Sequence, residues 1–570
     1  MSKIEITSET KLTDIEQHFR VSAGPGAGKT HWLCEHIKNV LHRSVRLEKT
    51  RKIACITYTN TAVETILSRI GTSAERAEIS TIHSFLYQHI IKPYAPFIAA
   101  EYGLNISEID GHDDTILSNF GFINDWKTRT AQQRIREDNL IAKAFHAIKW
   151  KFDSSGALVA GTDYPHKVGS YSIKKSSYLE YKKMAWEKGV LHHDDVLFFS
   201  FQIIKKFPFV LEVLRSKFPY IFIDEFQDSS PIQVEIFRNI GLKESKIGII
   251  GDQAQSIYKF QGADPTQFML FSLPGIIDYV MKENRRSTNE IIEVLNIVRK
   301  DITQEKYRNE SDSKPLIIIG DFANASQKIK HAYADEPLYS LSRDNITANL
   351  MKKQISGFND SKLFEELNDN DKPGSGNKYR SAIVAICIKA IEYAREGKFK
   401  DAIKEMQKEF KTKTDPMIGK RKSLDIIVLL LSNYDTYKDG SLYDFFTFVK
   451  QNIKPEISDL RKGSAKSFYD NHTYQQMTLC VKIPEDLSRD KTIHKAKGDE
   501  FDNVLLILPE EKDLSFLLTP DTQNNEEHRV NYVAVSRAKN KLFISVPTLS
   551  ATNMATLKSH FEIKTLLESI

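Results

Sequence analysis

The segment Ala23–Thr30, with the sequence AGPGAGKT, constrains the fold of this chain more than any other. It follows a short, partly apolar run, Phe19–Ala23, and precedes a stretch of helical character, His31–Leu41. Glycines let backbone N–H groups approach a polyphosphate, and the N-terminus of a helix adds partial positive charge. Lys29 can then reach the β- and γ-phosphates, and Thr30 can place its hydroxyl on Mg²⁺. Strand, glycine-rich loop and helix in this order predict an α/β fold that binds a nucleotide phosphate.

The loop departs from the usual pattern at its first residue. That pattern, G-x-x-x-x-G-K-[ST], begins with glycine, and here Ala23 stands in its place. A match of this kind also arises by chance in long chains, so the interpretation depends on the remaining sequence. The residues then expected to contact the nucleotide are Ala23, Gly24, Pro25, Gly26, Ala27, Gly28, Lys29 and Thr30.

Further strand–loop–helix units follow this loop. Ile53–Thr57 has the apolar, β-branched character of a buried strand, and Ala62–Ile70 has helical character. A second short unit, Ile79–Phe85, repeats the arrangement. Such units in series predict a parallel sheet with its loops gathered at one edge, where polar and aromatic residues can face a ligand. For either segment alone, ordinary loop chemistry is the simpler explanation.

A third apolar run, Tyr220–Ile223, ends in two acidic residues, Asp224 and Glu225. A buried strand of this kind delivers its carboxylates to the loop edge of the sheet. Asp224 can hold Mg²⁺, and Glu225 can orient and deprotonate an attacking water. Hydrolysis of a bound nucleotide needs these two functions, so the pair supports the interpretation of the glycine-rich loop.

A fourth run, Ile247–Gly251, also ends in an acid, Asp252. The segment after it offers the amide of Gln255 for a γ-phosphate. Two aromatic residues, Tyr258 and Phe260, can stack on nucleic-acid bases.

Composition narrows the class of protein. Of the 570 residues, 41% are hydrophobic and 27% are charged, which is typical of a globular protein with several domains. The formal charge of +5 is compatible with a nucleic-acid partner but is not evidence for one. The four cysteines are scattered without a C-x-x-C pair, so neither a zinc site nor a disulfide framework is indicated. The N-terminus has no apolar signal core and the longest apolar run, Ile426–Leu431, is too short to span a bilayer, so we expect a cytoplasmic protein.

The order of these motifs resembles superfamily 1 helicases of the UvrD/Rep/PcrA type. That family also begins its phosphate loop with alanine, which accounts for Ala23. Its Asp-Glu-Phe-Gln-Asp sequence is matched residue for residue at Asp224–Asp228. Its Gly-Asp-x-x-Gln-Ser-Ile-Tyr-x-Trp-Arg-Gly-Ala sequence is matched with Phe260 in place of Trp and Gln261 in place of Arg. Other family motifs are similar to Thr57–Asn60, His193–Val196 (which contains Asp195), Glu283–Thr288, Thr492–Phe501 and Glu526–Ala538.

The resemblance implies an α/β fold with two RecA-like parallel-sheet cores, each with a mainly helical inserted subdomain. The implied boundaries are 1–88 and 196–275 for the first core, 89–195 for its insertion, 276–354 and 475–570 for the second core, and 355–474 for the other insertion. Within the first insertion we expect helices such as Ala131–Trp150, whose basic surroundings can follow a phosphate backbone or form a solvated face. Within the second insertion we expect amphipathic helices around Lys378–Gly397 and Ala402–Phe410. Within the second core we expect strands at Val504–Leu508 and Lys541–Val546.

The resemblance also implies site residues, with ATP and Mg²⁺ as cofactors. Arg286 and Arg537, both expected from the second core, would be arginine fingers, and Arg285 and Glu500 would contact the nucleotide. The implied catalytic set is Lys29, Asp224, Glu225, Gln255, Arg286 and Arg537, with Thr30 and Asp224 on the metal. The implied nucleic-acid set is Tyr58, Thr59, Asn60, His83, Tyr258, Phe260, Thr492 and His494.

Three positions depart from the family pattern. Gln17 lies too near the phosphate loop to match the glutamine that reads adenine in the family. Arg285 replaces the tyrosine expected to stack on the base, although a guanidinium plane can also stack. Gln261 replaces an arginine that would contact phosphate or DNA.

Two functions are compatible with these motifs. The first is an ATP-dependent DNA helicase or translocase, moving 3′-to-5′ on single-stranded or tailed DNA, in DNA repair or in anti-phage defence. The second is a nucleic-acid-sensing ATPase switch that regulates a partner nuclease without processive unwinding. Relatives of this compact shape, such as the helicase-like subunit of Gabija anti-phage systems, work beside a nuclease partner, so a partner protein of that kind is expected by analogy.

Overall fold

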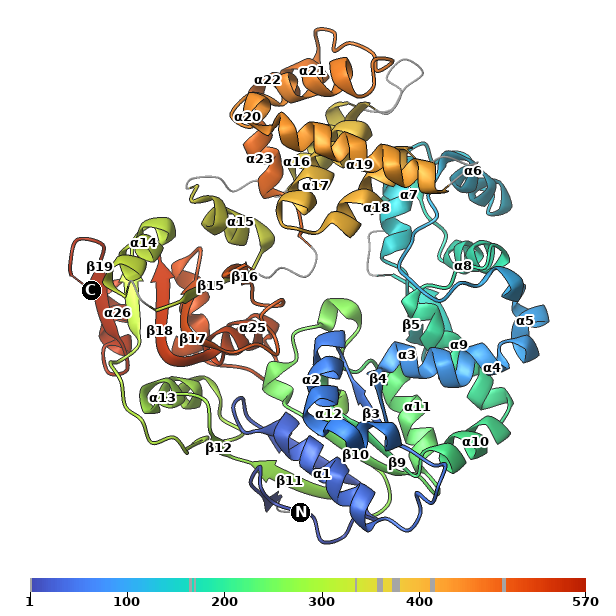
Figure 1. The fold of residues 1–570 in the computed structure, drawn as a ribbon, viewed down its shortest axis with the longest axis vertical. Coiled ribbons are helices and arrows are strands. Elements are labelled where there is room, and N and C mark those ends of the chain that lie inside the picture. The colour runs from blue at the N-terminus through green and yellow to red at the C-terminus, as the bar shows by residue number, and fades with distance from the viewer. Residues whose placement is uncertain are drawn as a thin grey trace. The chain divides into compact units, whose positions relative to one another are not determined.

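Two α/β units share the chain, and each is assembled from segments that are separated in sequence (Figure 1). Unit 1 comprises the residues up to Ser287 together with Val298–Asn309 and Asp521–Arg529, and unit 2 comprises the others. The computed structural model describes residues 3–162, 167–168, 171–333, 336–355, 362–371, 380–410, 416–483 and 488–569. Lys378, at the start of one expected helix, lies outside these ranges.

Unit 1 is organised around a seven-stranded sheet in which every neighbouring pair of strands is parallel. In spatial order its strands are β1 (Ile4–Glu5), β11 (Ile277–Met281), β2 (Phe19–Ala23), β10 (Lys246–Gly251), β9 (Tyr220–Ile223), β3 (Ile53–Thr57) and β4 (Ala77–Thr81). Because the strands are parallel, the loops that follow them gather at one edge. The boundary expected at residue 276 is wrong by this pairing, since β11 lies beside β2 in the first sheet.

Both faces of this sheet are buried, which explains why its strands are continuous apolar runs rather than alternating ones. Ile53 and Cys55 of β3 pack with residues of α1 (Lys29–Arg43) and α2 (Asn60–Ile70). Their neighbours Ala54 and Ile56 point to the other face. There they pack with residues of α9 (His193–Lys206) and α11 (Pro231–Gly241).

One buried residue of unit 1 is polar although its neighbours are aromatic. His36 on α1 is surrounded by Phe19, Trp32 and Phe222, with ring centroids 5.0–5.1 Å away. Neither ring nitrogen has a hydrogen-bond partner within the described part of the chain. Burial lowers the pKa of His36 from 6.5 to about 3, so its ring is neutral in the folded protein.

Replacing His36 by phenylalanine is therefore expected to stabilise unit 1 by about 1–2 kcal/mol at neutral pH, because two unsatisfied polar atoms leave the core. As the pH falls below 6.5, His36 binds a proton in the unfolded chain but stays neutral in the folded one. The free energy of unfolding therefore falls, by about 2 kcal/mol at pH 5. His36→Phe should remove this part of the pH dependence.

All four tryptophans lie in unit 1, so urea unfolding followed by tryptophan fluorescence reports on this unit. The expectation would be contradicted if the free energy of unfolding of His36→Phe varied with pH as steeply as that of the native chain. An equal stabilisation from His31→Phe, at a half-exposed position, would also contradict it.

The inserted part of unit 1 contains α6 (Phe120–Arg129), α7 (Asp138–His146) and α8 (Ser177–Glu187), with a hairpin of β5 (Lys149–Phe152) and β6 (Leu158–Gly161). The helix expected over Ala131–Trp150 is wrong at both ends. Ala131 has a left-handed backbone, with φ 52°, and Trp150 belongs to β5. The Trp150 indole donates to the carboxylate of Asp195, which lies on α9. The sequence around Trp150 does not indicate this contact.

Unit 2 contains a second sheet of six strands, and again every pair is parallel. Its spatial order is β16 (Asp490–Thr492), β15 (Leu338–Ser342), β17 (Phe501–Ile507), β18 (Ala538–Val546), β14 (Leu316–Ile319) and β19 (Glu562–Thr565). The predicted α/β class with two parallel sheets is confirmed.

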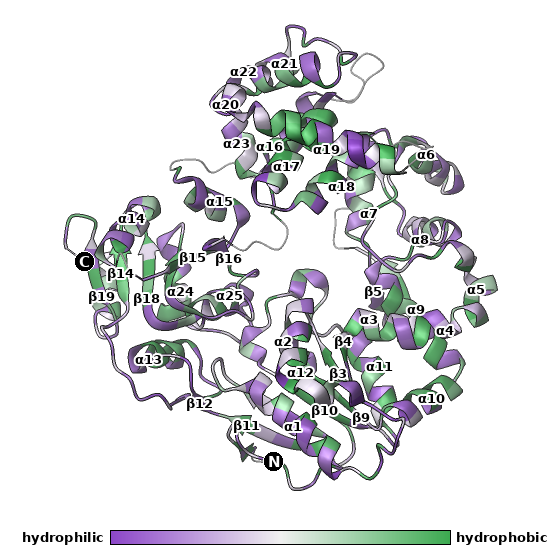
Figure 2. Ribbon diagram, in the orientation of Figure 1, coloured by the Kyte–Doolittle hydropathy of each residue, from purple (hydrophilic) through white to green (hydrophobic). Residues whose placement is uncertain are grey.

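A helical part of unit 2 has a hydrophobic core of its own. Its helices include α17 (Arg380–Arg395), α18 (Phe399–Phe410), α19 (Pro416–Ser432) and α21 (Leu442–Asn452). The apolar stretch of α19 is visible in green in Figure 2. In the described ranges, no helix combines the length and the hydrophobicity needed to cross a membrane.

Candidate nucleotide and nucleic-acid site

The glycine-rich loop joins the buried strand β2 to α1 at the loop edge of the first sheet. Gly26 and Gly28 have φ of 72° and 80°, which other residues rarely adopt. A Cβ on Gly26 would lie 2.5 Å from Asn284 Oδ1, and one on Gly28 would lie 2.8 Å from the Cβ of Ser8. The first turn of α1 carries no acidic residue, and Lys29 Nζ lies 3.4 Å from the carbonyl of Ala23. This cradle of backbone N–H groups, helix N-terminus and lysine fits a polyphosphate.

Asp224 and Glu225 follow β9 at the same edge. Asp224 is 5% exposed, and its N–H donates to the carbonyl of Ile56 at 2.8 Å. Glu225 has φ 53°, a left-handed backbone in a residue with a side chain, and its N–H donates to the Asp224 carboxylate at 3.0 Å. Such strained backbone persists where the surroundings impose it and concentrates at functional sites. With the hydroxyl of Thr30, the Asp224 carboxylate is the oxygen ligand that suits Mg²⁺.

A buried polar network connects Glu225 to Gln255. The Gln227 amide donates to the Glu225 carboxylate, and its carbonyl oxygen accepts from the N–H of Asp252 at 2.9 Å. The Asp252 carboxylate in turn accepts from Gln255 Nε2 at 2.6 Å. The structure therefore brings the expected base and the expected γ-phosphate amide into one hydrogen-bonded chain.

Arg299 supports this network and was not foreseen. Its guanidinium pairs with the Asp252 carboxylate at 2.8 Å, and both side chains are almost fully buried. A second arginine, Arg529, donates to the carbonyl of Ser256 at 2.7 Å. Both residues lie far from the first core segments in sequence, so no local pattern places them there.

Arg286 is held in unit 1 by a short clamp, β12 (Glu283–Asn284) paired with β13 (Glu305–Lys306). Asn284 Oδ1 accepts from the N–H groups of Arg286 and Ser287 at 2.9 and 3.0 Å. Asn284 Nδ2 donates to Gln304 at 2.7 Å. The Cβ of Arg286 lies close to the phosphate loop, 2.8 Å from where a Cβ on Gly26 would lie.

Loss of this clamp should slow turnover more than it weakens nucleotide binding. Asn284→Ala leaves two N–H groups without their acceptor and frees the segment that carries Arg286. We expect kcat for ATP hydrolysis to fall about 10- to 100-fold, with a smaller change in KM, because misplacement by about 1 Å can cost that much. Steady-state kinetics measures the changes in kcat and KM separately. Tyr307→Phe, which keeps a ring in place, is the matched control, and a change in KM alone for Asn284→Ala would contradict a positioning role.

Arg285, which stands where the family pattern implies a tyrosine, makes contacts of its own. The Arg285 guanidinium lies 3.9 Å from the centroid of the Tyr307 ring and pairs with Glu283 at 2.8 Å and Glu9 at 3.2 Å. The backbone N–H of Arg285 donates to the carbonyl of Gly26 at 2.9 Å. The side chain is thereby fixed beside the phosphate loop as a flat, cationic group.

Four of the expected residues belong to unit 2. The Arg537 guanidinium is 3% exposed and donates to the carbonyls of Val533 and Asp499, both at 3.1 Å. Glu500 pairs with Lys539 at 3.2 Å. The other two are Thr492, at the end of β16, and His494, two residues further on.

In unit 1 the structure brings three expected nucleic-acid contacts together at the loop edge. Tyr58 and Tyr258 stack on each other with centroids 4.9 Å apart, and Phe260 lies 6.0 Å from Tyr258 with 65% of its surface exposed. The Tyr58 hydroxyl donates to Gln261. Thr59 and Asn60, also expected, begin α2, where the Thr59 hydroxyl accepts from the N–H of Ala62 at 3.2 Å.

His83 lies in a cluster of three histidines that its sequence context did not reveal. Nδ1 atoms of His112 and His193 are 2.6 Å apart, and the His83 ring lies 5.5 Å from that of His193. Burial and these two neighbours lower the pKa of His83 to about 4, so His83 is uncharged at neutral pH. No group of three or more His, Cys, Asp or Glu side chains among the described residues is arranged to hold a metal ion.

Together, a phosphate loop, an acid-ended neighbouring strand and a glutamine linked to its glutamate are the parts of a nucleotide site of the phosphate-loop class. Residues 6–273 match the family model described as the UvrD/REP helicase N-terminal domain. Residues 282–548 match the model of the UvrD-like helicase C-terminal domain. The chain therefore belongs to the UvrD-like helicase family.

Individual relatives are similar at modest identity. PcrA, an ATP-dependent DNA helicase of Bacillus subtilis (strain 168), is 27% identical over 298 residues, which are 50% of this chain and 38% of PcrA. The Gabija protein GajB of Bacillus cereus (strain HuB5-5) is 27% identical over 407 residues, which are 62% of this chain and 58% of GajB. PcrA of Staphylococcus aureus (strain Mu50 / ATCC 700699) is 27% identical over 52% of this chain and 38% of its own length. The match thus spans less than two thirds of each relative.

Proposed function

We propose that this chain is a DNA-dependent ATPase that translocates 3′-to-5′ on single-stranded DNA and separates strands of tailed duplexes. The observation that carries the proposal is the hydrogen-bonded chain from Glu225 through Gln227 and Asp252 to Gln255. It joins the expected catalytic base to the segment that bears the half-buried Tyr258 and the exposed Phe260. Nucleotide state and base contacts are thereby connected within one unit.

The roles of the residues follow from their chemistry. Backbone N–H groups of the loop and Lys29 hold the phosphates, while Thr30 and Asp224 hold Mg²⁺, which offsets negative charge on the phosphates. Glu225 orients an attacking water and takes its proton. Arg286, anchored beside Gly26, stabilises charge that develops on the transferred phosphoryl group.

Arg537 serves as the second arginine finger in this proposal. To act on a phosphate, its guanidinium has to exchange its present bonds to Val533 and Asp499 for charge-assisted ones. An arginine of this kind is worth about a thousandfold or more in phosphoryl-transfer rate. Engagement and release of Arg537 would then couple hydrolysis to conformational change.

The pathway is proposed to be anti-phage defence beside a nuclease partner, since the longest aligned relative named here is a Gabija protein. Likeness to PcrA supports DNA repair as the other pathway. A sensing switch that regulates a partner without unwinding is the second candidate function. Its supporting observation is the Tyr58–Tyr258 stack, in which each ring covers one face of the other.

Strand separation on duplexes with 3′ or 5′ single-stranded tails tests these functions. A translocating helicase releases the labelled strand from the 3′-tailed duplex only, and only with hydrolysable ATP. A sensing switch hydrolyses ATP on the same DNA without releasing a strand. Phe260→Ala should reduce the DNA stimulation in either case, because a base stack is worth roughly 1–3 kcal/mol. Release from the 5′-tailed duplex would exclude the proposed polarity.

A further inference from the structure

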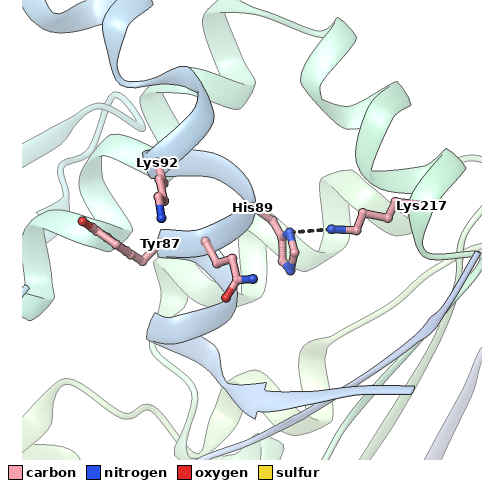
Figure 3. Close-up of a pocket in the computed structure, with 5 residues that line it drawn as sticks. Tyr87, His89, Lys92 and Lys217 are labelled. Atoms are coloured by element: carbon pink, nitrogen blue, oxygen red, sulfur yellow. Dashed lines mark hydrogen bonds between the residues drawn. The ribbon is translucent and has the colours of Figure 1, made fainter. Parts of the chain in front are cut away.

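A polar cavity lies in unit 1 at the edge of the sheet opposite the phosphate loop. Figure 3 shows Tyr87, His89, Lys92 and Lys217 around it. Lys217 ends α10 (Phe209–Lys217), just before the first residue of β9, whereas the catalytic acids follow the last one. Since all strands of the sheet run parallel, the cavity and the ATP site occupy opposite edges. Nothing in the proposed ATPase cycle uses this place.

Two of the lining residues, Lys217 and His89, belong to a chain of three groups that ends at Glu78, which does not itself line the cavity. Lys217 Nζ lies 3.1 Å from His89 Nδ1, and the other ring nitrogen of His89 contacts the Glu78 carboxylate. An ammonium can only donate, so His89 accepts at Nδ1 and carries its proton on Nε2, toward Glu78. The His89 side chain is 5% exposed and lies between the rings of Phe85 and Phe218. This packing holds the Lys217 ammonium at the cavity wall with further N–H groups to donate.

The backbone around the cavity is unusual. Tyr87–Ile91 forms a π-helical turn, in which the N–H of Lys92 donates to the carbonyl of Tyr87. Such wide turns inside α-helices occur frequently at functional sites. The turn brings Lys92 to the cavity beside Gln88, so two ammonium groups and one amide line a space of about 430 Å³. Among the described residues that line it, none is acidic.

A second hollow of about 550 Å³ adjoins the first at Lys217. Its lining includes the hydroxyls of Thr50 and Ser216 and the partly exposed apolar side chains of Phe209 and Val213. An anionic group in the first cavity would therefore have room beside it for an organic body with a flat or apolar part.

We propose that this cavity is a second anion site, which binds the phosphate group of a phosphate ester between Lys92 and Lys217. The ester can be a free nucleotide or the terminal phosphate of a nucleic acid, and both present the same chemistry to the two lysines. Lysines bind phosphate as point charges, and His89 serves as the positioning residue that fixes one of them.

The test uses the full chain carrying Lys29→Ala, which weakens the phosphate loop so that calorimetry reports the second site. Pyrophosphate is the first probe, at physiological ionic strength. We expect saturable binding that falls about tenfold or more in Lys217→Gln and in Lys92→Gln, since each loses a charged contact. Lys243→Gln, an exposed lysine that lines neither hollow, should bind as before. Lys217→Arg should recover part of the affinity, and unchanged melting curves without probe show that each variant is folded.

Two further probes identify the source of the phosphate. ADP and a 5′-phosphorylated oligothymidylate are compared with the same oligonucleotide lacking its phosphate. Lysine-dependent binding of ADP assigns the site to a free nucleotide, and lysine-dependent binding of the phosphorylated oligonucleotide alone assigns it to a nucleic-acid end. If no probe binds, or if Lys92→Gln and Lys217→Gln bind every probe as tightly as the parent chain, the proposal is overturned. DNA-stimulated hydrolysis by the chain with native Lys29 is scored separately, so failure of one proposal does not imply failure of the other.

Discussion

Chains carrying Lys29→Ala or Glu225→Gln are expected to lose DNA-stimulated ATP hydrolysis, by about a thousandfold or more. Lys29 is the one side chain of the loop that can neutralise the β- and γ-phosphates. In the proposed mechanism, Glu225 takes the proton of the attacking water, a function worth roughly 10²–10⁴-fold. Its left-handed backbone and its bond from Gln227 show that the protein maintains this one placement at a cost in local strain.

The two variants should differ in binding. Glu225→Gln keeps the loop intact, so a fluorescent ATP analogue should bind it about as well as the native chain, whereas Lys29→Ala should bind it weakly. Glu244→Gln, an exposed acid of the same unit, is the matched control and should hydrolyse ATP normally. Retained turnover in both Lys29→Ala and Glu225→Gln would remove the basis for the proposed chemistry.

The second large effect is expected in stability. Asp195 on α9 is completely buried and accepts hydrogen bonds from the indoles of Trp150 and Trp186 at 2.8 and 3.1 Å. It also pairs with Lys182 at 2.8 Å and with His192 Nδ1 at 2.9 Å. Although burial alone would raise it, the charge of Lys182 and the hydrogen bond from His192 hold the pKa of Asp195 well below its ordinary value.

Asp195→Asn should therefore destabilise unit 1 by about 3–5 kcal/mol, because it removes the direct ion-pair partner of the buried Lys182 ammonium. The stabilisation from Asp195 is present above its ordinary pKa of 3.8 and is lost as the pH falls below it. Urea unfolding monitored by tryptophan fluorescence measures both effects, since two of the four tryptophans touch this carboxylate.

Two variants make this test specific. Asp194→Asn changes the neighbouring carboxyl, which accepts the N–H of Trp150 at 2.6 Å, and should cost less than about 1 kcal/mol. Adding Lys182→Met to Asp195→Asn should restore much of the loss, because the uncompensated charge is then gone. Equal losses for Asp194→Asn and Asp195→Asn would show that charge pairing is not the reason.

The elements that sequence predicted well are those specified locally. Ile53–Thr57 coincides with β3, and Tyr220–Ile223 with β9, because short apolar runs between turns have few alternatives to a buried strand. The position of Asp224 and Glu225 at the loop edge could be predicted because both directly follow β9 in sequence. The phosphate loop was predictable in full, since its glycines, its lysine and its helix are adjacent in sequence.

What could not be predicted depends on partners far along the chain. The sequence of β11 does not indicate which sheet the strand joins. Its partner β2 lies more than two hundred residues earlier. Trp150 lies on a strand because its indole meets Asp195. The histidines His112 and His193 come together with His83 only once α9 is placed. Charge, composition and periodicity carry no information on such pairings.

The interleaved segments of unit 1 also fix the order in which this protein can be completed on the ribosome. Gln304, which supports the clamp on Arg286, comes after part of unit 2 has been synthesised, and Arg529 comes after most of it. The first sheet can pair early, yet its network around Ser256 must wait for a residue near the end of the chain. Contacts of such long sequence separation form late and slowly. A nascent or truncated chain would therefore hold a folded sheet without the completed contact between Arg529 and Ser256.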